Sequence, residues 1–132
     1  MILLGSKAAN VTNSLPTWRL NSYSNNEYDI LGSEIELQNL LDYFTAKDIM
    51  YATTETDYNK VFIFCPKNYK IEFDYHMSVS AFIIKNLSDN VACTIFDFDA
   101  KAISTVTQYI IKKATSACSQ FQTQKFYLFF LQ

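Results

Sequence analysis

Glycine and proline are scarce in this chain: of its 132 residues, only two are glycine and two are proline. Loops that cradle phosphate groups depend on glycine, because only a residue without a Cβ lets the backbone approach an anion closely. Gly5 and Gly32 are isolated and cannot form a Walker loop, a dinucleotide-binding fingerprint or a nucleophile elbow. The shortage therefore argues against the enzyme classes that depend on these motifs.

Cysteine and histidine are also few. Cys65, Cys93 and Cys118 are an odd number, widely separated and without a CxxC pair, which argues against a disulfide framework and a zinc site. The single histidine, His76, could join Asp74 and Cys65 in a set resembling a catalytic triad. However, Cys65 lies on the same face of its predicted strand as Val61 and Ile63, which favours a role in core packing. The sequence predicts no catalytic residue, no metal and no cofactor.

Arginine is nearly absent, and the net charge is −2. Recognition of nucleic acids relies on arginine forks and basic patches, so we expect no nucleic-acid partner. No apolar run approaches the roughly 20 residues of a membrane-spanning helix, and the first residues lack the basic region of a secretory signal. The sequence therefore predicts a soluble, cytoplasmic protein without a membrane partner.

Apolar residues make up 49% of the chain and aromatic residues 16%, which is enough for the core of one domain spanning residues 1–132. Residues 1–16 are polar after Leu4, so we expect them to be poorly ordered. Hydrophobic periodicity predicts strands and two helices. The expected strands are 17–22, 27–31, 49–54, 60–65, 69–75, 77–86, 91–98 and 126–131. For 77–86 the pattern leaves strand and helix open, and we favour strand.

The two predicted helices have different signals. The first follows Ser33, which forms a capping-box pattern with Glu36, and the second covers about 100–121, with Asp99 as its cap. The apolar stripe of the first helix consists of Ile35, Leu37, Leu40, Leu41 and Phe44. This element order predicts an α+β fold: a single, mostly antiparallel sheet of about six to eight strands with two helices packed on one face.

Acidic residues are concentrated in one part of the chain. Residues 27–57 contain eight acids and one base, Lys47, a segment charge of about −7. One interpretation is a set of solvated charges, some of which favour a helix N-terminus. The other is an acidic, tyrosine-containing face that binds a basic protein. The predicted partner-binding residues are Glu27, Tyr28, Asp29, Glu34, Asp42, Tyr51, Glu55, Asp57 and Tyr58.

A resemblance to a known group adds to the second interpretation. Residues 17–44 contain a strand around Trp18, a Gly32-Ser33 elbow and a capped helix with leucine spacing. This segment resembles the openings of small bacterial immunity proteins, which neutralise toxins of polymorphic or contact-dependent growth-inhibition systems. The resemblance implies a cytoplasmic antitoxin, often acidic, that covers a basic nuclease toxin.

Two other functions stay open. One is a phage- or plasmid-encoded adaptor that binds a host defence complex. A small metal-dependent enzyme could use Asp97 and Asp99, which flank Phe98 near the end of a predicted strand. The helix-capping interpretation of Asp99 is simpler, so we favour a binding protein over an enzyme. The sequence leaves the oligomeric state open, since the apolar strand 126–131 could pair across a dimer edge.

Overall fold

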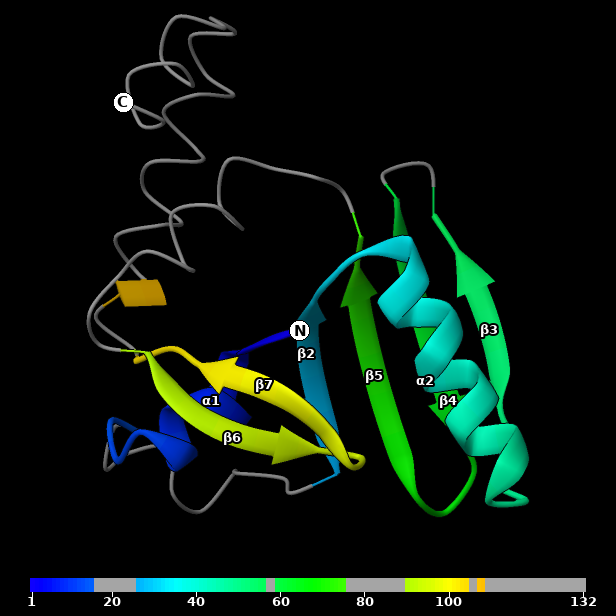
Figure 1. The fold of residues 1–132 in the computed structure, drawn as a ribbon, viewed down its shortest axis with the longest axis horizontal. Helices are drawn as coiled ribbons and strands as arrows, with labels where there is room; N and C mark the ends of the chain where they lie inside the picture. Colours follow the sequence, from blue (N-terminus) through cyan, green and yellow to red (C-terminus); the bar gives the residue numbers. More distant parts are fainter. Residues whose placement is uncertain (16–25, 57–58, 76–89, 105–106, 109–132) are drawn as a thin grey trace, which may run out of the picture.

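The computed structural model describes residues 1–15, 26–56, 59–75, 90–104 and 107–108, and its strands form one seven-stranded sheet (Figure 1). The strands are β1 (Ile2–Leu4), β2 (Glu27–Leu31), β3 (Ala52–Glu55), β4 (Lys60–Cys65), β5 (Tyr69–Asp74), β6 (Val91–Ile95) and β7 (Phe98–Ala102). Their order is β3-β4-β5-β2-β1-β7-β6, with parallel pairing only for β1–β7 and β2–β5. With the helices α1 (Gly5–Val11) and α2 (Glu34–Ala46), this confirms the predicted α+β class.

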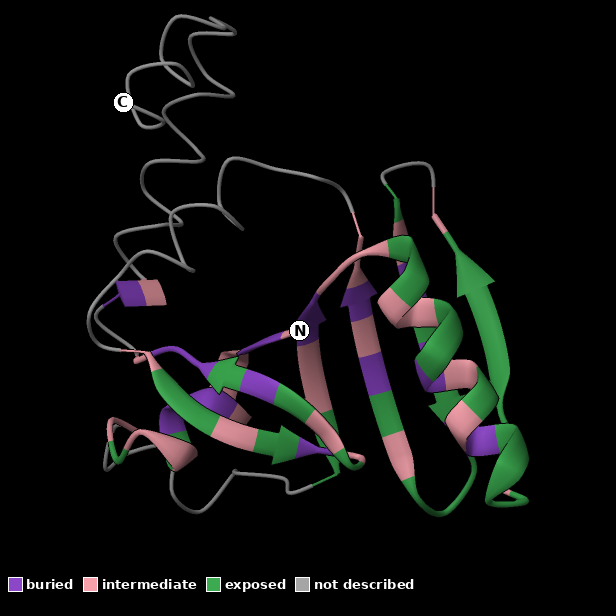
Figure 2. Ribbon diagram, in the orientation of Figure 1, coloured by how far each residue is buried: buried purple, intermediate pink, exposed green. Residues whose placement is uncertain are grey.

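The hairpin of β4 and β5 follows the predicted alternation of buried and exposed residues (Figure 2). On β4, Val61, Ile63 and Cys65 are buried, and on β5, Ile71 and Phe73 are buried. Because neighbouring residues of a strand point to opposite faces, these five side chains form one apolar surface. The surface is completed by Leu3 and Ile30 from the adjacent strands and is the main core of the molecule.

Helix α2 covers this apolar surface over β4 and β5 (Figure 1). Its Leu40 and Phe44 are fully buried, and the ring of Phe44 stacks on Tyr69 with 6.2 Å between centroids. Ile35 is a correction to the predicted stripe, because 73% of it is exposed. Ile35 and Phe44 are nine residues apart, which at about 100° per residue places them on opposite sides of the helix.

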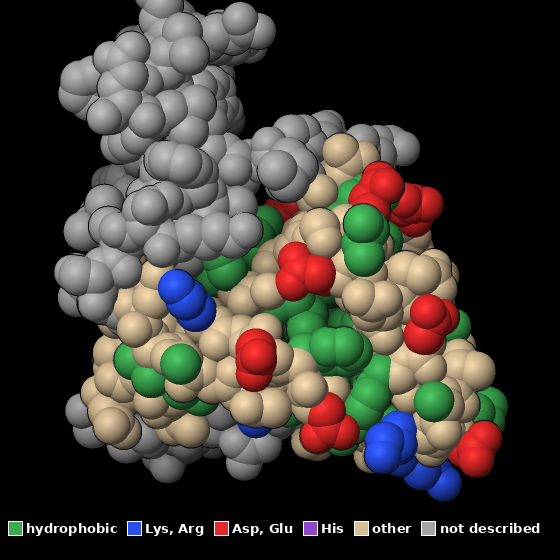
Figure 3. Space-filling view, viewed as in Figure 1, with side chains coloured by type: hydrophobic (Ala, Val, Ile, Leu, Met, Phe, Trp, Pro, Cys, Tyr) green, Lys and Arg blue, Asp and Glu red, His purple; other side chains and the backbone are tan. Residues whose placement is uncertain are grey.

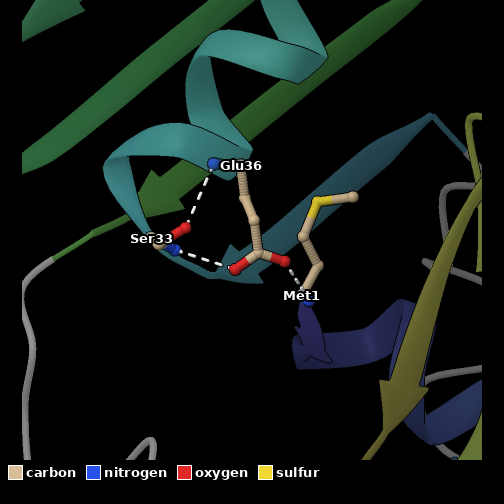
Figure 4. A network of polar contacts seen from close by, with 3 residues as sticks. All are labelled: Met1, Ser33 and Glu36. Carbon is tan, nitrogen blue, oxygen red and sulfur yellow. Dashed lines mark hydrogen bonds and ion pairs between the residues drawn. The ribbon is translucent and has the colours of Figure 1, made fainter.

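The start of α2 has the predicted capping box (Figure 4). The Glu36 backbone amide donates to Ser33 Oγ over 3.1 Å, and the Ser33 amide donates to Glu36 Oε1 over 3.0 Å. The second carboxylate oxygen of Glu36 pairs with the Met1 ammonium at 2.5 Å. Although burial alone would raise the pKa of Glu36, these hydrogen bonds and the ammonium charge lower it. The box therefore fixes the start of the helix and ties it to β1.

We expect Ser33→Ala to lower the free energy of unfolding by about 1 kcal/mol, because one amide of the first turn loses its acceptor. Urea denaturation followed by circular dichroism measures this change. Asn39→Ala is the matched control, since Asn39 is exposed in the middle of the same helix. A variant Ser33→Ala as stable as the parent protein would show that the cap contributes nothing.

The first residues differ from the prediction, because β1 and α1 occupy a segment that the sequence suggested to be poorly ordered. Three apolar residues are enough for β1, since it is paired on both sides, with β2 and β7. In α1, Ala8 and Ala9 are buried. Figure 1 shows α1 behind β6 and β7, whereas α2 lies in front of the sheet. The two described helices thus lie on opposite faces of the sheet, and only α2 belongs to the predicted pair.

The region after Val91 contains a hairpin where the sequence suggested a strand 91–98 followed by a helix. β6 ends at Ile95, and Ile95 pairs with Phe98 across the two-residue turn Phe96-Asp97. Both turn residues have positive φ, 50° and 66°, as the tight hairpin turn requires. Asp99 therefore lies within β7 and caps no helix at residue 100. The predicted strands 17–22, 77–86 and 126–131, and residues 109–121 of the predicted helix, lie outside the described residues.

Candidate functional site

The predicted partner-binding residues do not share one surface. Glu34 and Asp42 are exposed on α2, and Glu55 is exposed on β3. Glu55 pairs with Val61, so it lies on the same side of the sheet as α2. Residues Asp57 and Tyr58 lie outside the part of the chain that the structure describes. We call Glu34, Asp42 and Glu55 the acidic surface; Figure 3 shows acidic side chains distributed over this side of the molecule.

A hollow of about 420 Å³ lies between α2 and the end of β3. Its apolar lining comes from Ile35, Leu37 and Leu41, and Glu34 and Glu55 also line it. The Tyr75 hydroxyl donates a hydrogen bond to Glu55. This bond, with burial and the charges of Glu55 and Glu34, raises the pKa of Tyr75 to about 12. Tyr75 therefore stays a hydrogen-bond donor at neutral pH and holds the Glu55 carboxylate at the hollow.

Exposed apolar side chains accompany the acidic surface. Ile35 lies beside Glu34, and Met50 and Tyr51 follow the end of α2, with 78% and 38% exposed. Tyr51 also contacts the Phe44 ring, with 6.2 Å between centroids. Asp42 accepts a hydrogen bond from Gln38, one turn earlier on the helix, over 2.9 Å. Protein interfaces combine apolar side chains at the centre with a polar rim, and the acids here would belong to the rim.

Tyr28 belongs to the core and not to an exposed face. Its ring lies 4.8 Å from Phe96 and 5.8 Å from Tyr69, measured between centroids, and burial raises its pKa. The Lys7 ammonium lies 4.8 Å from the centre of the same ring. Tyr28 is half-buried, and its ring packs against groups of the same chain.

Glu27 and Asp29 lie on the face opposite the acidic surface. They alternate with Tyr28 and Ile30 along β2 and pair with Lys70 and Glu72 of β5. A cavity of about 450 Å³ lies there, lined by β2, β4, β5 and the residues that begin α1. Burial, with the charges of Glu72 and Asp74, raises the pKa of Asp29 to about 6, while Lys60 acts in the other direction.

The alternative sites that the sequence offered are not assembled in the described residues. Asp97 lies in the β6–β7 turn; burial raises the pKa of Tyr43, and the charge of Asp97 and a hydrogen bond with it act in the same direction. Asp99 lies beyond the turn, in β7, so the two acids do not end one strand as predicted. No cluster of three metal-binding side chains occurs within the described ranges. Cys65 is buried in the core, as predicted, and burial raises its pKa; His76 lies outside these ranges.

Several residues of the hollow beside α2 and of the cavity on the opposite face were not predicted from the sequence. Tyr75, which follows β5, packs against the core, and its hydrogen bond to Glu55 was not predicted. Phe62 and Phe64 are 45% and 49% exposed on the face opposite α2. Their exposure could have been predicted from the sequence, because they alternate with Val61, Ile63 and Cys65 along β4. Residues that alternate with a buried set lie on the other face, whatever their hydrophobicity.

Neither described helix has the length and apolar character that crossing a bilayer requires. Comparisons of the chain with protein-family models, with curated proteins and with solved structures found no match.

Proposed function

We propose that this chain is an inhibitor that binds a basic protein through the acidic surface. The observation that carries the proposal is the hollow between α2 and β3, in which Glu34 and Glu55 accompany an apolar lining. A lysine or arginine side chain has matching chemistry, since its aliphatic stem can cover apolar surface while its charged end meets carboxylates. The resemblance of residues 17–44 to immunity proteins favours a toxin domain as this partner.

The composition of the surrounding surface supports the proposal. Ile35 is exposed beside Glu34, and Met50 and Tyr51 are exposed beyond the other end of α2; large exposed apolar side chains can act as anchors in an interface. Carboxylates around such anchors speed the encounter with a basic partner and disfavour acidic ones. In this assignment, Glu27, Tyr28 and Asp29 take no part in binding the protein partner.

We expect the double variant Glu34→Lys, Glu55→Lys to bind its partner with an association rate about tenfold lower at low salt, because electrostatic steering is reversed. The dissociation rate should change less. The partner is first captured from lysate of the native host with the tagged chain, and both rates are then measured by surface plasmon resonance at low and high salt.

The double variant Glu27→Lys, Glu72→Lys is the matched control, since it makes the same charge change on the opposite face of the sheet. Its association rate should stay close to that of the parent protein. Equal slowing by the control and by the double variant would mean that only the total charge matters. In that case the acidic surface is not the binding site.

A further inference from the structure

The cavity on the face opposite the acidic surface is built from two rows of side chains that cross three strands. One row consists of Phe62 on β4, Glu72 on β5 and Asp29 on β2, which are paired in register. The second row consists of Phe64, Lys70 and Glu27 on the same strands. Each row therefore leads from an exposed aromatic ring to a carboxylate.

The beginning of α1 closes one side of this cavity. Leu4, Gly5, Ser6 and Lys7 line it, and Leu4 pairs with Asp29. Gly5 lies so close to Asp29 that an added Cβ would be 3.2 Å from the Asp29 Cβ, and its φ of +71° is one that side chains rarely adopt. The cavity volume of about 450 Å³ is in the range of small-molecule sites, about 300–1,000 Å³.

The charges of the lining favour a cation as ligand. Three carboxylates, Glu27, Asp29 and Glu72, face two ammonium groups, those of Lys7 and Lys70. Glu72 is paired with Lys60 at 3.0 Å, and Lys7 lies over the Tyr28 ring. Among the described residues, Asp29 takes part in no ion pair. A half-buried carboxylate in one cavity with two exposed phenylalanine rings, two strands away, suits a ligand that combines a flat apolar body with a positive charge at its end.

We propose that this cavity binds a small aromatic amine, with its ring against Phe62 and Phe64 and its ammonium group at Asp29. The inference is independent of the proposed function, because the acidic surface lies on the other face of the sheet. Only binding is proposed, and no bond is made or broken.

The test compares three probes of nearly the same ring system and different charge: tryptamine, 3-methylindole and indole-3-propionate. Calorimetry and NMR titration of the full chain measure their dissociation constants. We expect tryptamine to bind most tightly and indole-3-propionate most weakly. Equal affinities for the three, or no saturable binding of tryptamine, would overturn the proposal.

Two variants locate the site. Asp29→Asn keeps the shape of the side chain and removes its charge. It should weaken the binding of tryptamine about tenfold, as expected for the loss of a charge-assisted hydrogen bond, and leave the binding of 3-methylindole unchanged. Phe64→Ala should weaken the binding of both probes. Asp42→Asn, on α2, is the control and should change neither. If Asp29→Asn binds tryptamine as the parent protein does, the ammonium group is not at Asp29.

The pH provides a further readout. Tryptamine stays protonated, whereas Asp29 is faced by Glu72 and Asp74 of β5 and by Lys60 of β4, and its pKa is about 6. Lowering the pH from about 7.5 to about 5 neutralises most of this carboxylate, so affinity should fall about tenfold in the parent protein. Asp29→Asn should show no such fall. A parent protein with pH-independent affinity would contradict the assignment of Asp29.

Discussion

Replacing Phe44 with alanine is expected to lower the free energy of unfolding by about 4 kcal/mol, the range for a fully buried phenylalanine. Phe44 is 0% exposed, and its ring contacts those of Tyr43, Tyr51, Tyr69 and Phe96. These rings come from α2, from the residue before β3, from β5 and from the β6–β7 turn. Truncation would therefore leave a cavity where four parts of the chain meet. Urea denaturation measures the loss.

Ile35→Ala is the matched control for this variant, because it truncates an apolar side chain of the same helix that is 73% exposed. We expect it to change stability by no more than about 0.5 kcal/mol. Similar losses for the two variants would mean that α2 packs on the sheet through a different side. The comparison therefore tests the orientation of the helix as well as the size of the core.

A second large effect is expected at Asp29, in the opposite direction. The pKa of this carboxyl is about 6 in the folded chain, against an ordinary value of 3.8. The folded state thus holds the proton more tightly than the unfolded state. The stability contributed by the protonated group is fully present below about pH 4 and is lost as the pH rises through about 6. Ionised Asp29 therefore destabilises the protein at neutral pH.

Asp29→Asn removes this cost, and we expect it to be more stable than the parent protein by about 3 kcal/mol at neutral pH. The difference should shrink towards zero at about pH 4, where the parent carboxyl is protonated in the folded state. Chemical denaturation at a series of pH values measures it. A constant difference across the series would exclude ionisation as the cause. Glu27→Gln, an exposed carboxylate on the same strand and face, serves as the control.

These two expectations for Asp29 support each other. A variant that loses tryptamine binding while gaining stability cannot have lost binding through unfolding. A carboxylate kept in a site where it destabilises the fold is typical of functional residues, because function and stability often conflict. If the variant proved less stable, the site would be structural and the binding proposal would lose its clearest test.

The sequence predicted the parts of the fold whose signals are local. The β4–β5 hairpin has alternating apolar residues on both strands and a Pro66-Lys67-Asn68 turn between them, so its strands were predicted to within a residue. The start of α2 was predicted because the Ser33–Glu36 capping box is a side-chain and backbone pattern within four residues. Neither prediction needed knowledge of the distant parts of the chain.

The β6–β7 hairpin could not be found in the same way. Hairpin turns with two positive φ values usually contain asparagine, aspartate or glycine, but here phenylalanine is the first of the two residues. The Phe96 ring lies among Tyr28, Tyr43, Phe44 and Tyr69. Core packing therefore compensates an unfavourable backbone conformation. Such a turn is specified by residues far away in sequence, which no local pattern reveals.

The acidic segment was only partly interpretable. Its composition was evident, but its division between two faces depends on β2 being inserted between β1 and β5. In that position, Tyr28 packs among the aromatic rings of the core, and Glu27 and Asp29 lie on the face away from α2. The alternation along β2 was available in the sequence, whereas its neighbours in the sheet were not. Charge counts along a chain therefore do not define a surface until the sheet order is known.

The position of β1 has a consequence for how the chain folds. β1 pairs with β2 on one side and, in parallel, with β7 on the other, so Ile2 lies beside Lys101. Among the described strands, β3-β4-β5-β2 and the β6–β7 hairpin are connected by backbone pairing only through this three-residue strand. Closing the sheet thus requires two distant parts of the chain to meet, which is entropically costly and slows folding. We expect the two groups of strands to form first and their union across β1 to limit the rate.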